Sequence, residues 1–399
     1  MQRDITDIFI SGGGVAGLTA SAAFGAAGFS VICADPAPPV TDPTADGADL
    51  RTTAFLQPAR QLLESAGLWD RLEPHAAPLQ VMRIVDAGGA TSEPRAIKDF
   101  DAGEISDAPF GWNFPNWLLR RELAARLADL PNVSFRPGTG TASVLTRANA
   151  ALIRLSDGSS VSARLLIAAD GRNSPVRHAL GITVRTLRYG QKALAFAVTH
   201  PLPHGNISTE VHRSGGPFTL VPLPDRDGRP SSAVVWMERG PEAMRLAALP
   251  AAAFEAEMFA RSGGLLGPLT LVTRRSVWPI ISQIADRFAA ERAALMAEAA
   301  HVVPPIGAQG LNMSLADLAC LLDLAKAAPD RLGDREMLDA YHRRRWPEVK
   351  ARVTGIDLLN RASMAGAPVL RDLRAQALNA FFAATPIRRG LMRAGLGMR

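Results

Sequence analysis

The feature that most constrains this chain is a glycine-rich turn near its start, between an apolar run of strand length and a helix of small side chains at residues 18–27. Gly12, Gly14 and Gly17 stand in the spacing G-x-G-x-x-G. The first glycine permits a tight turn, the second lets the backbone approach a pyrophosphate, and the third lets the helix pack closely on the strand. The stretch therefore predicts a strand, turn and helix that bind a dinucleotide, with the helix N-terminus facing the phosphates.

A second predicted strand supports this interpretation. Residues 29–34 are apolar and lead to Asp35, about twenty residues after Gly14, where a carboxylate could accept the hydroxyls of an adenosine ribose. The alternative is a glycine-rich turn in an ordinary α/β unit, without a bound dinucleotide.

The composition indicates a folded protein with no nucleic-acid partner. The chain has 399 residues, of which 47% are hydrophobic. That length predicts about two to three domains or lobes. The net charge is +6, but only four of the 44 basic residues are lysines, and most arginines are scattered among acidic residues. Such a pattern lacks the basic stripe and interleaved aromatic residues expected of a nucleic-acid surface.

Cysteine usage and hydropathy predict a cytoplasmic protein. Cys33 and Cys320 lie far apart in apolar sequence, which indicates buried thiols in a reducing compartment. The N-terminus has no charged-then-apolar leader, and no uninterrupted apolar run is long enough to span a bilayer.

Two charged residues at the ends of predicted elements are candidates for the dinucleotide site. Arg51 precedes a helix that could direct it toward the dinucleotide, although a solvated arginine beside a loop fits the spacing equally well. Asp170 follows the continuous apolar run at residues 165–169, and ligands bind beyond the C-terminal ends of such buried strands. A simple Asp-Gly turn is the alternative there.

The remaining elements suggest a second, antiparallel sheet followed by helices. Strands without intervening crossover helices form a sheet suited to a substrate site. A late loop enters a helix whose N-terminus would favour an anion. In order, we predict a strand at 80–85, an irregular stretch at 99–115, a helix at 117–130, short strands at 133–164, antiparallel strands at 190–275 with a helix at 251–261, a strand at 292–296, a loop at 302–312, a helix at 313–327, and helices within 335–399 with Thr385 as the last N-cap and Pro386 in its first turn.

Three elements in this order resemble the class A flavoprotein aromatic hydroxylases. Within that class, residues 355–361 and 386–392 resemble the C-terminal region of the ubiquinone-biosynthesis hydroxylases, and the similarity extends over nearly the whole chain. The three elements are the glycine turn with Asp35, the strand ending in Asp170-Gly171 with Arg177 beyond it, and a late stretch containing Glu298-Ala299-Ala300-His301, Pro305 and Gln309-Gly310-Leu311-Asn312.

The resemblance implies an α/β fold in three parts and a flavin enzyme. The enzyme would use FAD, NADPH or NADH, and O₂ to hydroxylate the ring of a polyprenylated phenol in ubiquinone biosynthesis, through a flavin C4a-hydroperoxide. The expected parts are a FAD-binding Rossmann-like domain of the glutathione-reductase type (1–75, 112–185 and 278–330), an inserted, mainly antiparallel substrate domain (76–111 and 186–277), and a C-terminal helical region (331–399).

The resemblance also assigns cofactor contacts by position. No catalytic side chain is assigned because the flavin carries the chemistry, and the seven dispersed histidines predict no metal site. The expected FAD contacts are Gly12, Gly14 and Gly17 at the pyrophosphate, Asp35 at the ribose, Arg51, Asn116 and Asp170 along the cofactor cleft, Glu298 at a ribityl hydroxyl, Pro305 beside the isoalloxazine, and backbone groups of Gly307, Gln309, Gly310 and Asn312 at its pyrimidine edge.

Two departures from the family pattern lie at the flavin end of this site. The family's Gly-Asp before Ala-Ala-His is Ala297-Glu298 here, and its Ala-Gly-Gln-Gly is Gly307-Ala308-Gln309-Gly310. Ala308 would be strained by roughly 1 kcal/mol or more if its φ is positive. The alternatives to a prenylphenol hydroxylase are a non-catalytic flavin-fold subunit of a biosynthetic complex and an FAD hydroxylase of a soluble aromatic.

The C-terminal segment, residues 377–399, has a basic amphipathic pattern. Such a helix could approach the bilayer that holds a prenylated substrate, which predicts a peripheral position on the inner membrane. A helix that docks on a biosynthetic complex and an ordinary packed helix fit the pattern too. The apolar residues Phe381, Phe382, Ile387, Leu391, Met392 and Leu396 alternate with Arg388, Arg389, Arg393 and Arg399.

Overall fold

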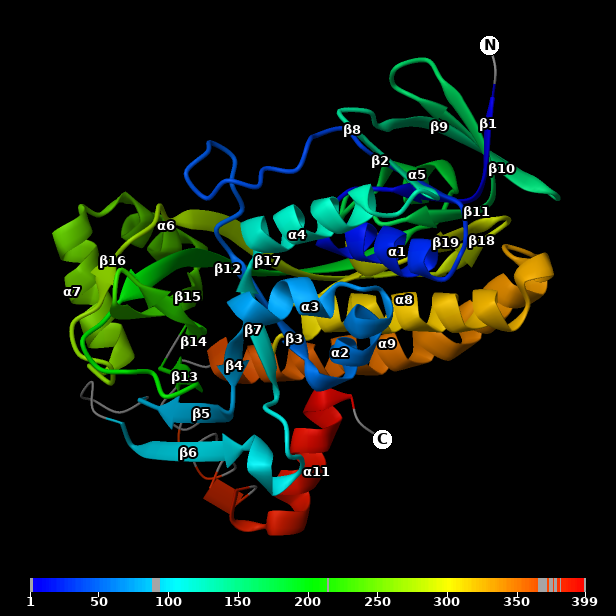
Figure 1. Cartoon of the computed structure of the whole chain (residues 1–399). Helices are drawn as coiled ribbons and strands as arrows, with labels where there is room; N and C mark the ends of the chain where they lie inside the picture. The colour runs from blue at the N-terminus through cyan, green and yellow to red at the C-terminus, as the bar shows by residue number, and fades with distance from the viewer. Residues whose placement is uncertain are drawn as a thin grey trace.

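The computed structural model describes residues 3–87, 94–213, 215–364, 372, 376, 379–380 and 382–397. Figure 1 shows an α/β molecule with two large sheets and long C-terminal helices, which confirms the predicted fold class. Residues 377–378, Phe381 and residues 398–399 of the predicted amphipathic segment lie outside the described residues.

The first sheet brings the glycine turn and two predicted site carboxylates to one edge. β1 (Asp4–Ser11) pairs in parallel with β2 (Val31–Asp35) and β11 (Ser160–Ala168). Because parallel strands end at the same edge, Gly12, Asp35 and Asp170 all lie along it. The other strands of this sheet are β8 (Val133–Pro137), β9 (Thr141–Arg147), β10 (Ala150–Leu155), β18 (Ala289–Ala290) and β19 (Ala293–Leu295).

Helices share the core of this first sheet. α1 (Val15–Ala26) is built of small and apolar residues and packs against β2, α4 and α8. α8 (Gln309–Ala327) starts earlier than the predicted Met313, because Ala308 adopts a left-handed φ of 55° and turns the chain directly into the helix. The other helices of this part are α2 (Gln57–Ser65), α3 (Trp69–Leu72), α4 (Asn116–Ala128), α5 (Pro175–Ala179), α9 (Arg335–Met364) and the 3₁₀ turns Glu73–His75, Ala297–Ala299 and Pro329–Arg331.

The second sheet has two distinct faces. In β12 (Val184–Thr199), Leu194 and Phe196 pack beneath α6 (Gly240–Ala248) and α7 (Ala251–Ser262), whereas Ala193 faces the other way and packs near Ile306. All its strand pairs are antiparallel except β13 with β5. The order is β20 (His301–Val302), β17 (Ser276–Ala285), β12, β15 (Arg229–Arg239), β14 (Pro217–Arg226), β13 (Ile207–His212), β5 (Val81–Asp86) and β6 (Ala96–Asp101), with β16 (Thr270–Leu271) paired to β12.

A small third sheet shows where the prediction of irregular structure at residues 99–115 was wrong. β7 (Gly111–Pro115) pairs with β3 (Thr52–Leu56) and β4 (Ala77–Leu79), and this range also holds the end of β6 and the 3₁₀ turn Ala102–Glu104. The partners of β7 lie far away in the chain, so no local pattern marks it as a strand. Helix α6 was also not predicted.

Three further expectations concern the termini, the thiols and membrane spans. Thr385 is the first residue of α11 (Thr385–Leu396) and Ala384 is its N-cap, so the predicted cap was one residue off. Cys33 is fully buried, and burial raises the pKa of its thiol to about 12, while Cys320 is partly buried. Within the described ranges, every helix is too short or too polar to cross a bilayer.

The predicted domain boundaries remain predictions. β12 and β17 both run across a predicted boundary and pair with each other over much of their length.

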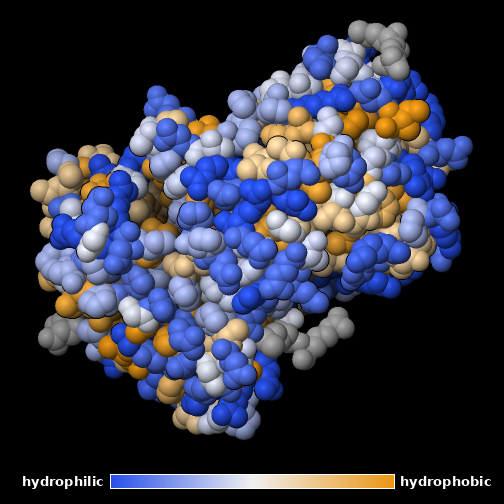
Figure 2. Space-filling model, viewed as in Figure 1, coloured by the Kyte–Doolittle hydropathy of each residue, from blue (hydrophilic) through white to orange (hydrophobic). Residues whose placement is uncertain are grey.

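Polar side chains cover most of the face shown in Figure 2, and the apolar ones form separate patches rather than a continuous band.

Candidate cofactor-binding site

The glycine turn combines two structurally required glycines with one that faces open space. A Cβ on Gly12 would lie 2.4 Å from the Ala169 carbonyl oxygen, and a Cβ on Gly17 would lie 1.8 Å from the Gly12 carbonyl oxygen. A Cβ on Gly14 would meet no atom within 4 Å. Gly14 caps α1, whose first turn holds no acidic residue. Gly12 and Gly17 therefore shape the turn, and Gly14 leaves room for an anion at the helix N-terminus.

Asp35 is held beside this turn. Its carboxylate accepts hydrogen bonds from the backbone N–H of Gly13 at 2.6 Å and of Ala37 at 2.8 Å. Because each carboxylate oxygen can accept more than one hydrogen bond, these contacts orient Asp35 and still leave acceptor capacity for a ribose hydroxyl.

Asp170 carries a buried acceptor without a partner. Its Oδ2 accepts a hydrogen bond from the Val176 N–H at 3.2 Å, but its Oδ1 is buried and makes none within the described structure. Burial is the largest influence on this carboxyl and raises its pKa, against hydrogen bonds from Ser174 and Val176. A buried acceptor left open fits a site that receives a hydrogen-bond donor from a ligand.

The raised pKa predicts that Asp170 lowers the stability of the ligand-free protein at neutral pH. A carboxyl whose folded pKa exceeds its unfolded value loses stability as the pH rises through that range. Asp170→Asn should therefore unfold at higher urea concentration than wild type at pH 7, and the difference should vanish below about pH 4. Asp157→Asn is the control of opposite sign, since hydrogen bonds from Ser159 lower the pKa of this exposed carboxyl. If the stability difference between Asp170→Asn and wild type did not change with pH, the raised pKa of Asp170 would be contradicted.

Arg51 is held by partners, although its side chain stays 40% exposed. Its Nε and one terminal nitrogen each donate to Asp49 at 2.7 Å, and its guanidinium lies 5.4 Å from the ring centre of Trp278 on the second sheet. Asn116 donates to the same Asp49 carboxylate at 3.0 Å and accepts from Thr53 at 2.7 Å. Arg51 and Asn116, both predicted from the sequence, are thus brought together by Asp49, which was not.

The loop that enters α8 is fastened by two of its predicted cofactor residues. Asn312 accepts from the Leu56 N–H at 2.9 Å and donates to the carbonyl of Ala54 at 2.8 Å. Gln309 donates to the Gly395 carbonyl in α11 at 2.9 Å and accepts from Arg352 at 3.0 Å. These side chains therefore hold the loop, and the free groups at this end are the backbone N–H groups of the first helical turn. A Cβ on Gly310 would meet no atom within 4 Å, so this turn also faces open space.

The two family departures sit at strained positions. Ala297 and Ala308 both have a φ of 55°, the left-handed region that favours glycine. Glu298 is half-exposed and lies 3.6 Å from Arg172. The strain expected for Ala308 from the sequence is therefore present, and Ala297 shares it.

Relief of this strain gives a stability prediction. Ala297→Gly and Ala308→Gly should each raise the free energy of unfolding by about 1 kcal/mol, because glycine adopts a left-handed φ without penalty. Urea denaturation measures the change. Ala316→Gly, in the interior of α8, is the matched control and should lose about 1 kcal/mol. An equal loss of stability in all three variants would show that Ala297 and Ala308 are not strained.

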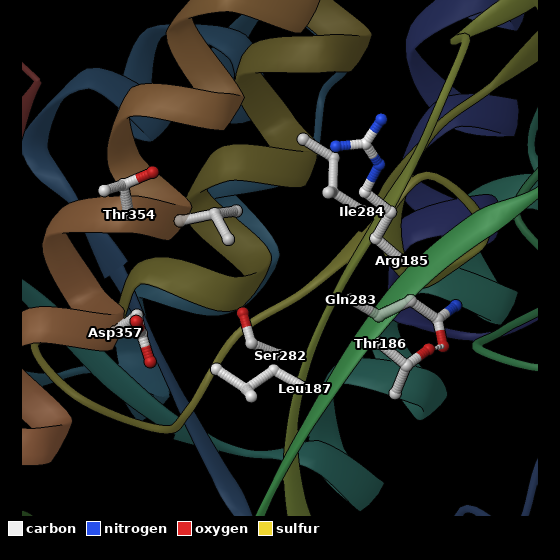
Figure 3. A pocket seen from close by; sticks show the side chains of 9 residues that line it. Arg185, Thr186, Leu187, Ser282, Gln283, Ile284, Thr354 and Asp357 are labelled. Atoms are coloured by element: carbon white, nitrogen blue, oxygen red, sulfur yellow. Dashed lines mark hydrogen bonds between the residues drawn. The ribbon is translucent and has the colours of Figure 1, made fainter.

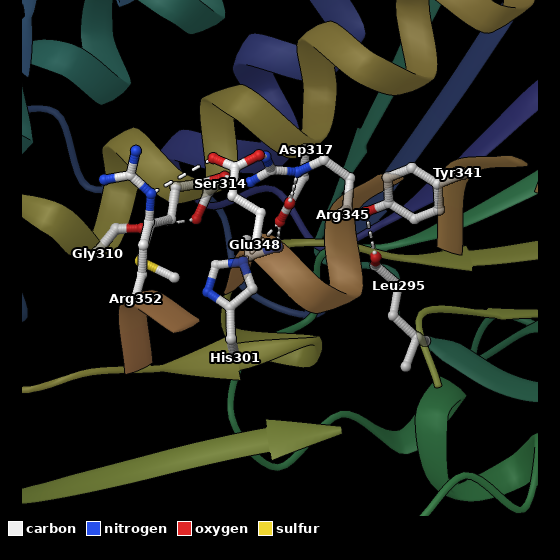
Figure 4. A network of polar contacts seen from close by, with 11 residues as sticks. Leu295, His301, Gly310, Ser314, Asp317, Tyr341, Arg345, Glu348 and Arg352 are labelled. Atoms are coloured by element: carbon white, nitrogen blue, oxygen red, sulfur yellow. Dashed lines mark hydrogen bonds and ion pairs between the residues drawn. The ribbon is translucent and has the colours of Figure 1, made fainter. Parts of the chain in front are cut away.

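A buried polar network fixes the segment that precedes this loop (Figure 4). Asp317 of α8 is fully buried and lies 2.6 Å from His301 Nε2 and 2.9 Å from Arg345 Nε of α9. The hydroxyl of Tyr341 donates to the Leu295 carbonyl at 2.8 Å. The network joins β19, β20, α8 and α9, and through His301 it fixes the end of the segment 297–301. No spacing in the sequence marks Asp317 or Arg345 as partners.

One cavity of the described structure is lined by other residues than these (Figure 3). It measures about 240 Å³ and lies between β12, β17 and α9, and none of the predicted cofactor residues lines it. Ser282, Leu187 and Asp357 are among its lining residues.

Three observations fit the residues to an extended flavin dinucleotide. The space in front of Gly14 suits a pyrophosphate, the partnerless Oδ1 of Asp170 suits a donor along the cofactor, and the open first turn of α8 at Gly310 suits the polar edge of a flavin ring. Pro305 and Gly307 lie in the same loop as this turn. The roles of the individual residues remain predictions.

Known proteins match this fold over its full length. Residues 5–355 match the family described as the FAD binding domain. Ubiquinone hydroxylase UbiL from Rhodospirillum rubrum is 35% identical over 82% of this chain and 74% of its own length. 3-Demethoxyubiquinol 3-hydroxylase from Escherichia coli is 26% identical and covers 100% of both chains. The crystal structure of p-nitrophenol 4-monooxygenase PnpA from Pseudomonas putida has a TM-score of 0.81 at 20% identity, with 100% of both chains covered.

The family match and the fold together define an FAD-dependent monooxygenase of class A. The chain belongs to the FAD binding domain family. The family match gives FAD as the cofactor, as the resemblance predicted.

Proposed function

We propose that this protein hydroxylates the aromatic ring of a polyprenylated phenol in ubiquinone biosynthesis. The observation that carries the proposal is the 35% identity to a protein named a ubiquinone hydroxylase, over 82% of this chain. The 26% identity to 3-demethoxyubiquinol 3-hydroxylase over both full lengths supports the same reaction class.

The residues of the chain would position the reactants and exclude water. The glycine turn and the loop that enters α8 would hold FAD, which would supply the redox chemistry: hydride acceptance from NAD(P)H and activation of O₂ for transfer of one oxygen atom to the ring. The N-terminus of α8 would stabilise negative charge on the reduced cofactor through its free N–H groups. The apolar cluster of Ala193, Val235, Met237, Trp278 and Ile306 lines the inner face of the second sheet and would keep water from the reacting ring.

Arg51 would link the two parts of the site. Its ion pair with Asp49 is partly buried. Burial alone would raise the pKa of Asp49, but pairing with Arg51 and a hydrogen bond from Asn116 together lower it. The guanidinium therefore keeps a fixed position between the first part of the chain and Trp278 on the second sheet. A cation held there would favour binding of the anionic cofactors.

The test is a spectrum followed by a turnover assay. The purified protein should show flavin absorption when FAD is added, and a prenylated phenol should stimulate NAD(P)H oxidation and gain one oxygen atom by mass spectrometry. Absence of FAD binding would favour the non-catalytic subunit. Equal activity on the phenol with and without its prenyl chain would favour the hydroxylase of a soluble aromatic.

We further propose that α11 places the enzyme on the cytoplasmic surface of the inner membrane. On the outer side of this helix, Ile387 is 50% and Leu391 51% exposed, and Arg389 and Arg393 are exposed beside them. Apolar side chains flanked by arginines suit the boundary of an anionic bilayer. The protein should float with phosphatidylglycerol vesicles but not with phosphatidylcholine vesicles. Flotation lost in Ile387→Ser/Leu391→Ser would support the helix, whereas unchanged flotation would contradict it.

A further inference from the structure

The cavity between the second sheet and α9 has room for a small ligand. It measures about 240 Å³ and opens between the start of β12 and the end of β17 on one side and α9 on the other. Leu187, Ile284 and Val353 form the apolar part of its wall. An apolar cavity of roughly 150 Å³ holds a benzene molecule, so a single ring with small substituents would fit here.

The wall of this cavity carries a buried hydroxyl without a partner. Ser282 is only 4% exposed, and its Oγ makes no hydrogen bond within the described structure. Figure 3 shows Ser282 beside Leu187, facing the turn of α9 that carries Asp357. Buried polar groups nearly always have a partner, because an unpaired hydroxyl destabilises the fold. A free hydroxyl at a cavity wall therefore indicates a ligand that forms a hydrogen bond there.

A β-bulge brings a second hydroxyl to the same place. The pairing of β12 with β17 shifts register between Arg188 and Lys192, and Tyr189 lies within this bulge, a feature that redirects side chains. The hydroxyl of Tyr189 is buried and has no hydrogen-bond partner in the described ranges. Burial raises the pKa of Tyr189 to about 12, and Asp357 and Ser282 of the cavity wall also act on it. This hydroxyl therefore stays protonated at neutral pH and can donate.

The two charged residues of the described cavity wall already have partners. Asp357 accepts from the Nε of Arg361 at 3.0 Å, and the Nε of Arg185 lies 3.3 Å from Asp286. A charged ligand would lose its hydration here without gaining a free group of opposite charge. The cavity therefore favours a neutral ligand.

We propose that this cavity binds a small neutral ring that carries hydroxyl groups, with Ser282 and Tyr189 as its hydrogen-bond partners. The apolar wall would cover the ring. Each of the two protein hydroxyls can donate and accept, so each can bond a hydroxyl of the ligand. This site is additional to the ring site of the proposed function, and its ligand chemistry follows from the cavity wall alone.

The cavity adjoins the predicted ring site without being part of it. Trp278, Ile280 and Ser282 occupy alternate positions of β17 and so share one face of the strand. Trp278, Ile280 and Tyr189 belong to the apolar cluster that packs near Ile306 of the flavin loop. A ligand in the cavity would lie further along β17 than this cluster, beneath α9.

Fluorine NMR can locate the ligand, because the chain contains only two tyrosines, Tyr189 and Tyr341. The full-length protein with added FAD, labelled with meta-fluorotyrosine, is titrated with resorcinol in the absence of NAD(P)H. The Tyr189 signal, assigned with Tyr189→Phe, should shift until it saturates. The Tyr341 signal should stay in place, because this residue is fully buried and donates to the Leu295 carbonyl away from the cavity.

Three further measurements test the contacts. Ser282→Ala should weaken resorcinol binding about fivefold, the loss of one hydrogen bond between neutral groups. Thr354→Phe should abolish binding, because Thr354 is exposed at the cavity wall and a phenyl group would fill the space. Benzene, which has no hydroxyl, should bind at least fivefold more weakly than resorcinol. Ser276→Ala, at the other end of β17, is the matched control and should keep the wild-type affinity.

A saturable Tyr189 shift that weakens in Ser282→Ala and disappears in Thr354→Phe supports the proposal. A shift that persists in Thr354→Phe places the ring at the flavin-side site and overturns it. Absence of a shift in the wild type also overturns it, since the two hydroxyls would then bond water alone, and so does equal affinity for benzene and resorcinol. Circular dichroism and melting temperature establish that each variant is folded. No turnover is involved, so the oxygen-transfer assay tests the proposed function separately.

Discussion

Gly14→Val should abolish FAD binding without unfolding the protein. The valine Cβ would meet no atom within 4 Å, and Gly14 has an extended backbone with a φ of −72°, so the fold accepts the side chain. The isopropyl group would instead fill the space in front of the first turn of α1, where the pyrophosphate is predicted to lie. We expect the FAD dissociation constant to rise by about 100-fold or more, measured by titration of flavin fluorescence. The free energy of unfolding of the cofactor-free protein should stay near its wild-type value.

Two other glycines make this prediction specific. Gly17→Val should destabilise the fold itself, because its Cβ would lie 1.8 Å from the Gly12 carbonyl oxygen. Gly355 lies on α9, and a Cβ there would also meet no atom within 4 Å. Gly355→Val should therefore leave the FAD affinity unchanged and alter stability only through helix propensity. Wild-type FAD affinity in Gly14→Val would mean that the pyrophosphate does not lie at this turn.

Asp317→Ala should cause the largest loss of stability. The substitution leaves Arg345 and His301 buried without their shared carboxylate, which lies 2.9 Å from Arg345 Nε and 2.6 Å from His301 Nε2. Removing one partner of a buried ion pair costs about 3–5 kcal/mol. Urea unfolding at pH 7 measures the loss. Asp323→Ala, an exposed position on the same helix, is the control and should stay within about 0.5 kcal/mol of wild type.

The pH dependence of Asp317 provides a second check. Burial alone would raise the pKa of this carboxyl, but His301 and Arg345 outweigh burial and lower it. A carboxyl with a lowered folded pKa contributes stability above its unfolded pKa, near 3.9, and this stability is lost as the pH falls through the folded value. The gap between wild type and Asp317→Ala should therefore be full at pH 7 and shrink below about pH 4. A gap that persists unchanged in acid would assign the loss to packing rather than to charge.

The sequence predicted the parts of the site that depend on short-range pattern. Gly12, Gly14 and Gly17 needed only their spacing and the strands around them, since a turn between a strand and a helix is a local structure. The same holds for Asp170, which follows an uninterrupted apolar strand, whereas the strain expected at Ala308 came from its departure from the family pattern. The antiparallel strands of the second sheet were also found, because alternating side chains mark a strand whatever its partner.

Contacts between distant segments could not be predicted in this way. Asp49 lies two residues from Arg51, but nothing local shows that Asn116 completes the cluster. The resemblance assigns the backbone groups of Gln309 and Asn312 to the cofactor. It does not show that their side chains fasten the loop to Gly395 in α11 and to Ala54 in β3. β7 was taken as irregular because its strand character comes from pairing with β3 and β4.

The sequence by itself determined a dinucleotide-binding turn at the end of the first strand. Its family resemblance then indicated that the dinucleotide is FAD and that the protein is a hydroxylase. Backbone conformation and alternation are local properties, so residues near one another in the chain specify them. Only the tertiary structure decided that Asp317 joins α8 to His301 and to Arg345 of α9, and that α11 packs over the apolar cluster that includes Ala308. Those arrangements depend on which distant segments pack together, and the pattern of a single sequence does not show which segments do so.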